Sequence, residues 1–497
     1  MVAHTKAHMV AFMGIHAEGR IATEFELHRK QALKKGSIIT IELEKFADRG
    51  KSLARMDGYV VFVAGAVPGD TVKARVFKKR KKFAEAALLE VITPSSLRTE
   101  AKCSYFLTCG GCKWQHVNYD SQLEAKTQSV KDAFEHHGGF ESVQVEGTIG
   151  AEETYYYRNK MEFSFSAGRW LTPDEIASGE EFDTSFALGL HVPGNYAKVL
   201  DLNECHLQSE LSMNMVNAVR ELALENEWKP WDTRRHVGYL RHLVIREAAK
   251  MPELMVNLVT SYVDQERMAQ FAAFLKDRFP QVTTLVNTIN SGVAQTAFGE
   301  ESHVIFGSGV IHDKIGDCTF EIASNAFFQT NTKQAQTLYD VAARFAELKP
   351  DDLVYDLYCG AGTISCFIAP QVKHVVGVEL IKEAVQNARK NAKANGIENV
   401  SFITGDMMKL FNAAFVKKHG RPDVLIVDPP RAGLHPKVVE QIKELAPERF
   451  VYVSCNPMTQ ARDLALMADT YDVDIVQPVD LFPHTHHIES VARLRKK

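Results

Sequence analysis

Two residues that could do chemistry, Asp428 and Cys455, each follow a short apolar run in the C-terminal part of the sequence. Asp428 comes after VLIV and before two prolines, and Cys455 comes directly after FVYVS. Runs of this length are typical of buried strands, and a segment with helical spacing, VVEQIKEL, separates them. Because a double proline cannot continue a sheet, Asp428 is expected at the carboxyl end of its strand, where ligands bind in open α/β sheets. The sequence therefore predicts an acid and a thiol at one edge of a sheet.

Cys455 has two interpretations. A lone cysteine is most often a small buried hydrophobe. Here the thiol follows a strand and precedes Asn456-Pro457, where the chain must turn, and this favours a nucleophile placed for reaction. Arg431, close to Asp428 in sequence, could lower the pKa of the thiol, or it could orient a substrate or the loop.

A cofactor site is predicted upstream, where strand-like and helix-like segments alternate from residue 331 onward. The segment LVYDLYCGAGTISCFIA has the pattern of strand, glycine loop and helix, and Gly360 and Gly362 would let a ligand approach the backbone closely. The next two strand patterns end in Glu379, which could hold a ribose diol, and in Asp406. Since the loop lacks the full G-x-G-x-x-G and no P-loop lysine follows, the pattern argues against NAD and ATP and favours S-adenosylmethionine.

Three cysteines crowd together as C-x5-C-x2-C in CSYFLTCGGCKWQH: Cys103, Cys109 and Cys112. The glycine pair lets the backbone fold tightly, so that neighbouring thiolates can point at one centre. Cys205 is the best candidate for a fourth ligand. Four thiolates suit either zinc or an iron–sulfur cluster, and the spacing does not decide between them. Two histidines could replace a cysteine as ligand, although a solvent-side position suits each better: His116 and His206.

A cluster of positive charge lies in KARVFKKRKKF, within a stretch (residues 37–92) of short apolar runs separated by glycine turns. The period near two and the DG and PGD turns predict a small antiparallel barrel. The cluster interleaves Phe77 and Phe83 with cations, which suits an RNA backbone with bases to stack. The alternative is a solvated hairpin tip. The candidate RNA-binding residues are Lys78, Lys79, Arg80, Lys81 and Lys82.

The domain organisation predicted from these patterns is α/β with four segments. We expect an N-terminal extension (1–30), a small OB-like barrel (31–95), a central α+β domain with the cysteine cluster (96–320) and a doubly wound, Rossmann-like domain (321–497). Within the central segment, QLEAKTQSVKDAFEHHG has a helical pattern.

The composition limits the classes of partner and compartment. The net charge of −4 excludes an indiscriminate binder of polyanions, and no apolar run is long enough to span a membrane. The N-terminal patch MVAFMGI lacks the features of a signal peptide. We therefore expect a cytoplasmic protein, and a monomer, that binds RNA and no membrane.

Taken together, these motifs resemble the RNA uracil-C5 methyltransferases that make 5-methyluridine. The likeness covers nearly all of the chain after the first thirty residues and rests on CSYFLTCGGCKWQH, NAFFQTN, DLYCGAGT, GVEL, VDPPRAGLH, YVSCNPMT and HIESVARL. The barrel resembles a TRAM domain through GKSLAR, DGYVVFV and GAVPGD. The combination of barrel and cysteines is similar to the branch that acts on 23S ribosomal RNA and carries a [4Fe–4S] cluster, and not to the shorter transfer RNA branch that lacks both.

The resemblance implies a role for each candidate residue. Cys455 matches the nucleophile and Glu489 the base that removes a proton. In these enzymes the thiolate adds to uracil C6, C5 takes the methyl group, and a base must then remove the C5 proton. The positions for S-adenosylmethionine are Gln329, Tyr358, Glu379 and Asp428, with Asp406 nearby, and those for the cluster are Cys103, Cys109, Cys112 and Cys205.

Without the resemblance, several of these residues have simpler interpretations. Glu489 would be a surface salt-bridge partner, although SVARL after it suggests a strand entering the sheet. The preceding histidines, His484, His486 and His487, are interpreted as loop residues or weak RNA contacts. An amino-group methyltransferase would show an aromatic residue where Arg431 stands. Two further alternatives are a transfer RNA uracil-5-methyltransferase with the same mechanism and a non-catalytic RNA-binding assembly factor.

Overall fold

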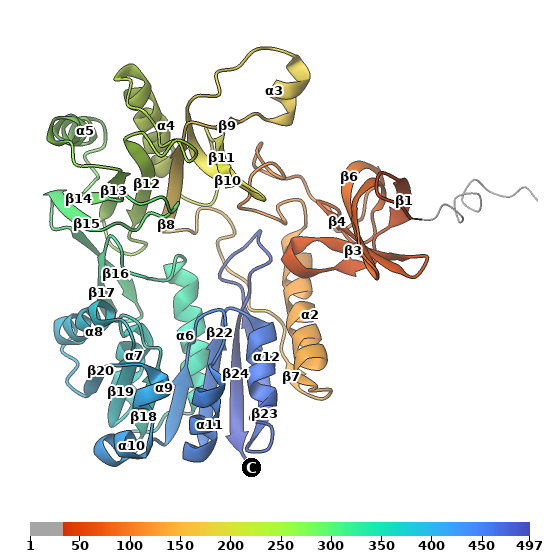
Figure 1. Cartoon of the computed structure of the whole chain (residues 1–497). Coiled ribbons are helices and arrows are strands. Elements are labelled where there is room, and N and C mark those ends of the chain that lie inside the picture. The colour runs from red at the N-terminus through yellow and green to blue at the C-terminus, as the bar shows by residue number, and fades with distance from the viewer. Residues whose placement is uncertain (1–32) are drawn as a thin grey trace, which may run out of the picture.

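The computed structural model describes residues 33–497, and the expected extension (1–30) lies outside the described residues (Figure 1). The chain forms a β module at its N-terminal end, a central α+β part, and a C-terminal α/β part (Figure 1). No helix among residues 33–497 is long and apolar enough to cross a bilayer.

The N-terminal module is a six-stranded sheet in the order β1-β5-β6-β4-β3-β2. Every second side chain of β5 is buried, among them Val72, Ala74 and Val76, while cations occupy outward positions, as a period of two requires. One pair departs from the expected antiparallel pattern: β4 and β6 are parallel neighbours in the sheet. The chain returns between them through β5, which runs in the opposite direction. The strands are β1 (Ile38–Glu42), β2 (Lys45–Phe46), β3 (Ser52–Met56), β4 (Tyr59–Ala64), β5 (Thr71–Lys79) and β6 (Phe83–Thr93), with a 3-10 turn, η1 (Asp48–Gly50).

The central part is an eight-stranded mixed sheet with two helices, α4 (Glu210–Glu225) and α5 (Gln265–Arg278), packed on its apolar face. Its order is β15-β14-β13-β12-β8-β10-β11-β9. The strands are β8 (Lys160–Ser166), β9 (Arg169–Trp170), β10 (Ala187–Val192), β11 (Asn195–Asp201), β12 (Leu240–Glu247), β13 (Leu254–Thr260), β14 (Thr284–Ile289) and β15 (Glu301–Phe306), and a short helix, α3 (Pro173–Ser178), follows β9.

A hairpin of β16 (Val310–Ile315) and β17 (Cys318–Ala323) leads into the C-terminal part. Its buried side chains, including Ile311, Ile315 and Phe320, share one core with the helices of that part. The expected boundary after residue 320 falls inside β17, and we propose that the C-terminal domain begins before this hairpin.

The C-terminal part is an eight-stranded sheet in the order β20-β19-β18-β21-β22-β24-β23-β7, with one apolar core on each face. The first five strands are parallel and the order reverses between β18 and β21, as in doubly wound folds. The strands are β18 (Leu353–Leu357), β19 (His374–Glu379), β20 (Val400–Thr404), β21 (Val424–Val427), β22 (Arg449–Ser454), β23 (Tyr471–Val479) and β24 (Glu489–Lys496). The helices are α6 (Thr332–Ala346), α7 (Thr363–Ile368), α8 (Lys382–Ala394), α9 (Met407–Leu410), α10 (Ala413–His419), α11 (Pro436–Leu445) and α12 (Pro457–Ala465), with a 3-10 turn, η2 (Ala369–Gln371).

One helix and one strand that precede the central sheet in the chain belong to the C-terminal part in space. Helix α2 (Tyr119–Gly138) packs along α12, and β7 (Gln144–Val145) pairs with β23 at the edge of the C-terminal sheet (Figure 1). This long helix therefore lies between the N-terminal module and the C-terminal sheet (Figure 1).

Candidate active site

Cys455 and Glu489 meet because two neighbouring strands run in opposite directions. The strand β22 ends at Ser454, and β24 begins at Glu489 and pairs with it antiparallel, with Ser454 opposite Ser490. The chain leaves β22 through Cys455 and enters β24 through Glu489, so both side chains lie at the same edge of the sheet. Asn456 then caps α12 and donates its side-chain amide to the carbonyl of Arg431 at 3.1 Å, which joins this turn to the Asp428 loop.

The electrostatics of this edge favour the neutral forms of both groups in the ligand-free protein. Burial raises the pKa of Cys455 to about 11, and the negative charge of Glu489 adds to this, while the Arg431 guanidinium opposes it. The Glu489 side chain is 5% exposed. Burial, with the charge of Asp428 beside it, raises the pKa of Glu489 well above its usual range, again opposed by Arg431.

Arg431 contacts a histidine, His487, that the sequence predicted to be a loop residue or a weak RNA contact. The Arg431 Nη2 lies 3.0 Å from His487 Nδ1. Burial lowers the pKa of His487 to about 3, so the ring is neutral and can accept a hydrogen bond from the guanidinium. The sequence signal that could have indicated this role is the position of His487, two residues before Glu489.

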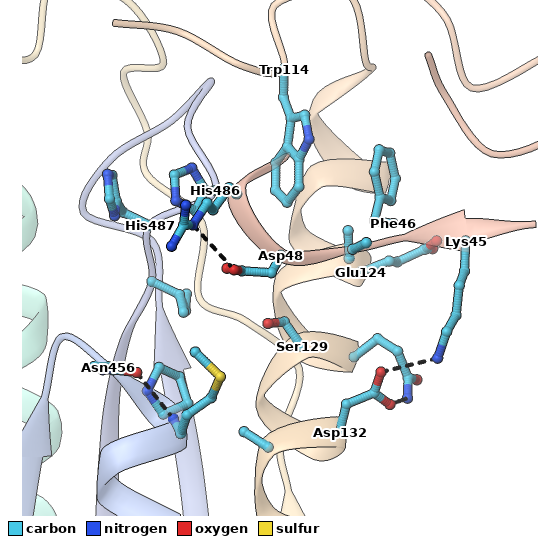
Figure 2. Close-up of a pocket in the computed structure, with 18 of the residues that line it drawn as sticks. Lys45, Phe46, Asp48, Trp114, Glu124, Ser129, Asp132, Asn456, His486 and His487 are labelled. Atoms are coloured by element: carbon cyan, nitrogen blue, oxygen red, sulfur yellow. Dashed lines mark hydrogen bonds and ion pairs between the residues drawn. The ribbon is translucent and has the colours of Figure 1, made fainter. Parts of the chain in front are cut away.

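A cavity of about 730 Å³ opens onto Cys455. One side is lined by Arg431, Cys455, Met458, His486 and His487, and the other by η1, β2 and helix α2. Figure 2 shows His486, His487 and Asn456 on the C-terminal side, facing Asp48 and Glu124 across the cavity. An ion pair of 3.3 Å between Lys45 and Asp132 joins β2 to α2 at its far end (Figure 2).

All the predicted cofactor residues except Gln329 lie at or after the ends of four successive parallel strands, β18 to β21. Tyr358 and Gly360, in the turn after β18, have φ of 67° and 54°. The Gly360 amide donates to Glu379 Oε2 at 3.2 Å, which ties the glycine turn to the end of β19. At Gly362, which caps α7, a Cβ atom would lie 2.7 Å from the Phe402 ring, so the close packing of this turn needs glycine.

The acids at this edge differ in their surroundings. Asp406 follows β20 and caps α9 by accepting from the Met408 amide at 3.0 Å. Asp428 follows β21, and burial, with the charge of Asp356, raises its pKa to about 7. Asp356, inside β18, was not singled out from the sequence, and burial raises its pKa to about 7 as well. Gln329 lies two residues before the N-cap of α6, and Asn159 Nδ2 donates to its carbonyl at 2.9 Å.

The four cysteines of the predicted cluster site line one small cavity: Cys103, Cys109, Cys112 and Cys205. Burial raises the pKa of each thiol, and for Cys103 and Cys112 the charges of the neighbouring thiols add to the effect. Among residues 33–497, no three Cys, His, Asp or Glu side chains lie close enough to hold a single metal ion. His206 also lines this cavity, whereas His116 is turned away and bonds to the Gly65 carbonyl at 3.1 Å.

The basic residues of the N-terminal module lie at the end of the β5–β6 hairpin. Lys78 forms an ion pair with Glu85, and the Lys79 ammonium lies 4.6 Å from the centre of the Tyr59 ring. Three further cations are exposed in the turn between the strands: Arg80, Lys81 and Lys82. Phe77, beside them, is 49% exposed.

Comparisons with known proteins agree with this architecture. Residues 32–89 match the TRAM domain family, and residues 265–497 match the family described as tRNA (Uracil-5-)-methyltransferase. An uncharacterised RNA methyltransferase of Chlorobaculum tepidum is 42% identical over 92% of this chain and 96% of its own length. One from Porphyromonas gingivalis is 43% identical over 91% of this chain and 99% of its own. The chain belongs to the uracil-5-methyltransferase family of RNA methyltransferases.

A solved structure shares most of the fold of this methyltransferase. The tRNA (uracil-54, C5)-methyltransferase of Pyrococcus abyssi, in complex with S-adenosyl-L-homocysteine, is 27% identical and superposes with a TM-score of 0.72. It covers 92% of this chain and 100% of its own. The predicted α/β fold class, the TRAM domain and the assignment to S-adenosylmethionine-dependent RNA methyltransferases are thereby confirmed, and the non-catalytic alternative loses its support.

Proposed function

We propose that this methyltransferase methylates C5 of a uridine in 23S ribosomal RNA, with Cys455 as nucleophile and Glu489 as base. The observation that carries the proposal is the meeting of a thiol and a buried carboxyl at the antiparallel junction of β22 and β24, beside Asp428 and Arg431. A methyl transfer to an amine would use neither the thiol nor a second carboxylate.

The proposed reaction assigns each bond to one of these groups. The Cys455 thiolate adds to uracil C6, which moves electron density to C5. C5 takes the methyl group from S-adenosylmethionine, which leaves as S-adenosylhomocysteine. The Glu489 carboxylate then takes the C5 proton, and the C6–S bond breaks to return the thiolate and the C5–C6 double bond.

The protonation of Cys455 and Glu489 in the ligand-free site suits an enzyme that substrate binding activates. Burial raises the pKa values of both Cys455 and Glu489 in the ligand-free protein, which favours the protonated form of each. A cation bound beside Asp428 and Glu489 favours the charged form of each carboxyl. The positively charged methyl donor would supply that cation, held by the turn at Tyr358, Gly360 and Gly362 and by the acids Glu379, Asp406 and Asp428, with Gln329 on the approach to α6.

We also propose that Cys103, Cys109, Cys112 and Cys205 bind a [4Fe–4S] cluster. The support is chemical: four half-buried thiols surround one cavity, yet no three of these ligands lie close enough for a single ion. A polynuclear cluster separates its thiolates further than one zinc ion does, because each thiolate binds a different iron. The cluster would cross-link residues 103–112 to the segment after β11.

The choice of ribosomal RNA rests on the combination of the TRAM domain and the cysteine site, which resembles the ribosomal branch of the family. The Pyrococcus abyssi neighbour, by its name, acts on transfer RNA, and this favours transfer RNA as the second candidate. In either case the target base must leave its stack to reach Cys455, and the exposed cations of residues 78–82 are proposed to bind the RNA backbone.

The experiment that tests the proposal measures methyl transfer from labelled S-adenosylmethionine to unmodified ribosomal RNA and transfer RNA in parallel, followed by nucleoside analysis. The expected result is label in 5-methyluridine from ribosomal RNA alone. Label from transfer RNA alone would overturn the substrate and keep the chemistry. Label in a methylated amine, or full activity of a Cys455→Ala variant, would overturn the proposed role of the thiol.

A further inference from the structure

The segment Asp480–Ile488, here called the strap, connects β23 to β24 and delivers Glu489 to its position. Three strap residues, His486, His487 and Ile488, line the cavity at Cys455, and His487 contacts Arg431. The strap has no regular secondary structure of its own among these residues. Its conformation therefore depends on contacts with the elements around it.

Helix α2 holds the start of the strap through a buried ion pair. Lys126 and Asp480 are both 0% exposed, and Lys126 Nζ lies 2.6 Å from Asp480 Oδ1. The same ammonium donates to the Phe482 carbonyl at 3.2 Å, and the Phe482 amide donates to Asp480 Oδ1 at 2.9 Å. The Tyr119 hydroxyl, also on α2, donates to Asp480 Oδ2 at 3.0 Å.

One turn earlier on α2, Gln122 holds the apex of the strap. Its side-chain oxygen accepts from the His484 amide at 2.9 Å, and its NH₂ group donates to the carbonyls of Trp114 and Val117 at 3.0 and 2.9 Å. The amides of Lys113 and Trp114 in turn donate to the His484 carbonyl at 2.8 and 3.0 Å. Both backbone groups of His484, its amide and its carbonyl, are thus hydrogen-bonded.

Net stability is a poor explanation for this arrangement. Replacing a buried ion pair with apolar side chains is often neutral or stabilising, because the charges lose their hydration. A buried hydrogen-bonded network instead selects one arrangement of the groups that it joins. Here the network joins α2 to the segment that carries His487 and Glu489. The residues that it pairs are far apart in the chain: Lys126 and Asp480 are separated by 354 positions, and Gln122 and His484 by 362.

We infer that Lys126 and Gln122 are positioning residues for methyl transfer, which fix the strap so that His487 and Glu489 stay opposite Cys455. The inference rests on the proposed function for the part that concerns Glu489. A displacement of about 1 Å in a catalytic group can lower the rate by roughly 100-fold. We therefore expect a defect in turnover and not in binding.

The test compares a double variant, Lys126→Met with Asp480→Asn, with the matched control Lys131→Met. The double change avoids leaving one buried charge without its partner, which would destabilise the fold. Lys131 is exposed on the same helix, so the control makes the same substitution away from the strap. Gln122→Ala is a second variant that leaves all charges in place.

Three measurements are made on folded full-length protein: hydrogen exchange of the strap amides, kcat and KM for methyl transfer, and the covalent protein–RNA adduct. The expected result for the double variant and for Gln122→Ala is faster exchange in residues 480–489, a kcat at least about 30-fold lower, and a KM for RNA and for S-adenosylmethionine within about twofold. The adduct should accumulate as in Glu489→Gln, and Lys131→Met should match the wild type.

Two outcomes would overturn the inference: unchanged strap exchange, or faster exchange with an unchanged kcat per folded molecule. Failure of the proposed function has a different signature. If Glu489→Gln turns over freely without adduct, Glu489 is not the base. If the double variant still loses kcat in that case, Lys126 and Gln122 position the strap for the role of His487 alone.

Discussion

Replacing Arg431 with methionine should make the thiol of Cys455 less acidic. The guanidinium is the cation that lowers the pKa of this thiol, against burial and the charges of Glu489 and Asp428. With a pKa of about 11, roughly one thiol in 1,000 is ionised near pH 8, compared with about one in ten for an ordinary thiol of pKa 9.0. The loss of a neighbouring opposite charge raises a pKa by about one unit or more.

The expected change in rate is smaller than the change in the thiolate fraction. One pKa unit lowers that fraction about tenfold, but the remaining thiolate is more nucleophilic, which recovers a factor of about three. Alkylation of Arg431→Met by iodoacetamide should therefore be about threefold slower than that of the wild type at each pH between about 7 and 9.

The assay follows one peptide. Cleavage after Arg449 and Arg462 releases residues 450–462, in which Cys455 is the single cysteine, so mass spectrometry reports its alkylation separately from the seven other cysteines. Lys437→Met is the matched control, because it removes an exposed cation from the helix after the same loop. If Arg431→Met and the wild type give the same profile, or Lys437→Met slows the reaction equally, Arg431 does not act on the thiol.

Three further predictions test the rest of the site. Glu489→Gln should methylate RNA but fail to release it, so that a protein–RNA adduct survives denaturing electrophoresis; normal turnover would remove Glu489 from the role of base. Binding of S-adenosylmethionine should weaken by up to about tenfold per pH unit below pH 7, since Asp428, whose pKa is raised to about 7, must lose its proton to face the cation. Calorimetry should find a smaller dependence for S-adenosylhomocysteine, whose sulfur carries no charge. Cys109→Ser should lose iron and visible absorbance, and should also lower methyl transfer, because Lys113 and Trp114, directly after Cys112, hold the strap; full iron content in this variant would contradict the proposed ligand set.

The parallel half of the C-terminal sheet could be predicted from local sequence. Each strand there is a short, mostly apolar run, and a polar residue at the end of such a run must lie at the carboxyl edge of the sheet. Asp428 and Cys455 follow adjacent strands, β21 and β22, and the structure places them at the same edge. This inference needed only the spacing of the apolar side chains and the rule that the carboxyl ends of parallel strands lie at one edge of the sheet.

The partner of Cys455 could not be derived in this way. Glu489 reaches the thiol because β24 inserts antiparallel between β22 and β23, and a short apolar run in the sequence does not state its direction or its neighbour. The resemblance to a family named Glu489, whereas periodicity alone left it as a surface acid. The raised pKa values of Cys455, Glu489 and Asp428 likewise follow from burial and neighbouring charges.

The amino-acid sequence by itself therefore determined the strands and helices of the parallel half, the polar residue that follows each parallel strand, and the types of reactive group. These features depend on contacts within a few residues. Only the tertiary structure decided that Lys126, one lysine in an evident helical pattern, is fully buried against Asp480. Helix α2 and β7 join the C-terminal sheet although they precede the central domain in the chain. Such pairings depend on which apolar and polar surfaces the whole chain can bury together, and no local pattern specifies them.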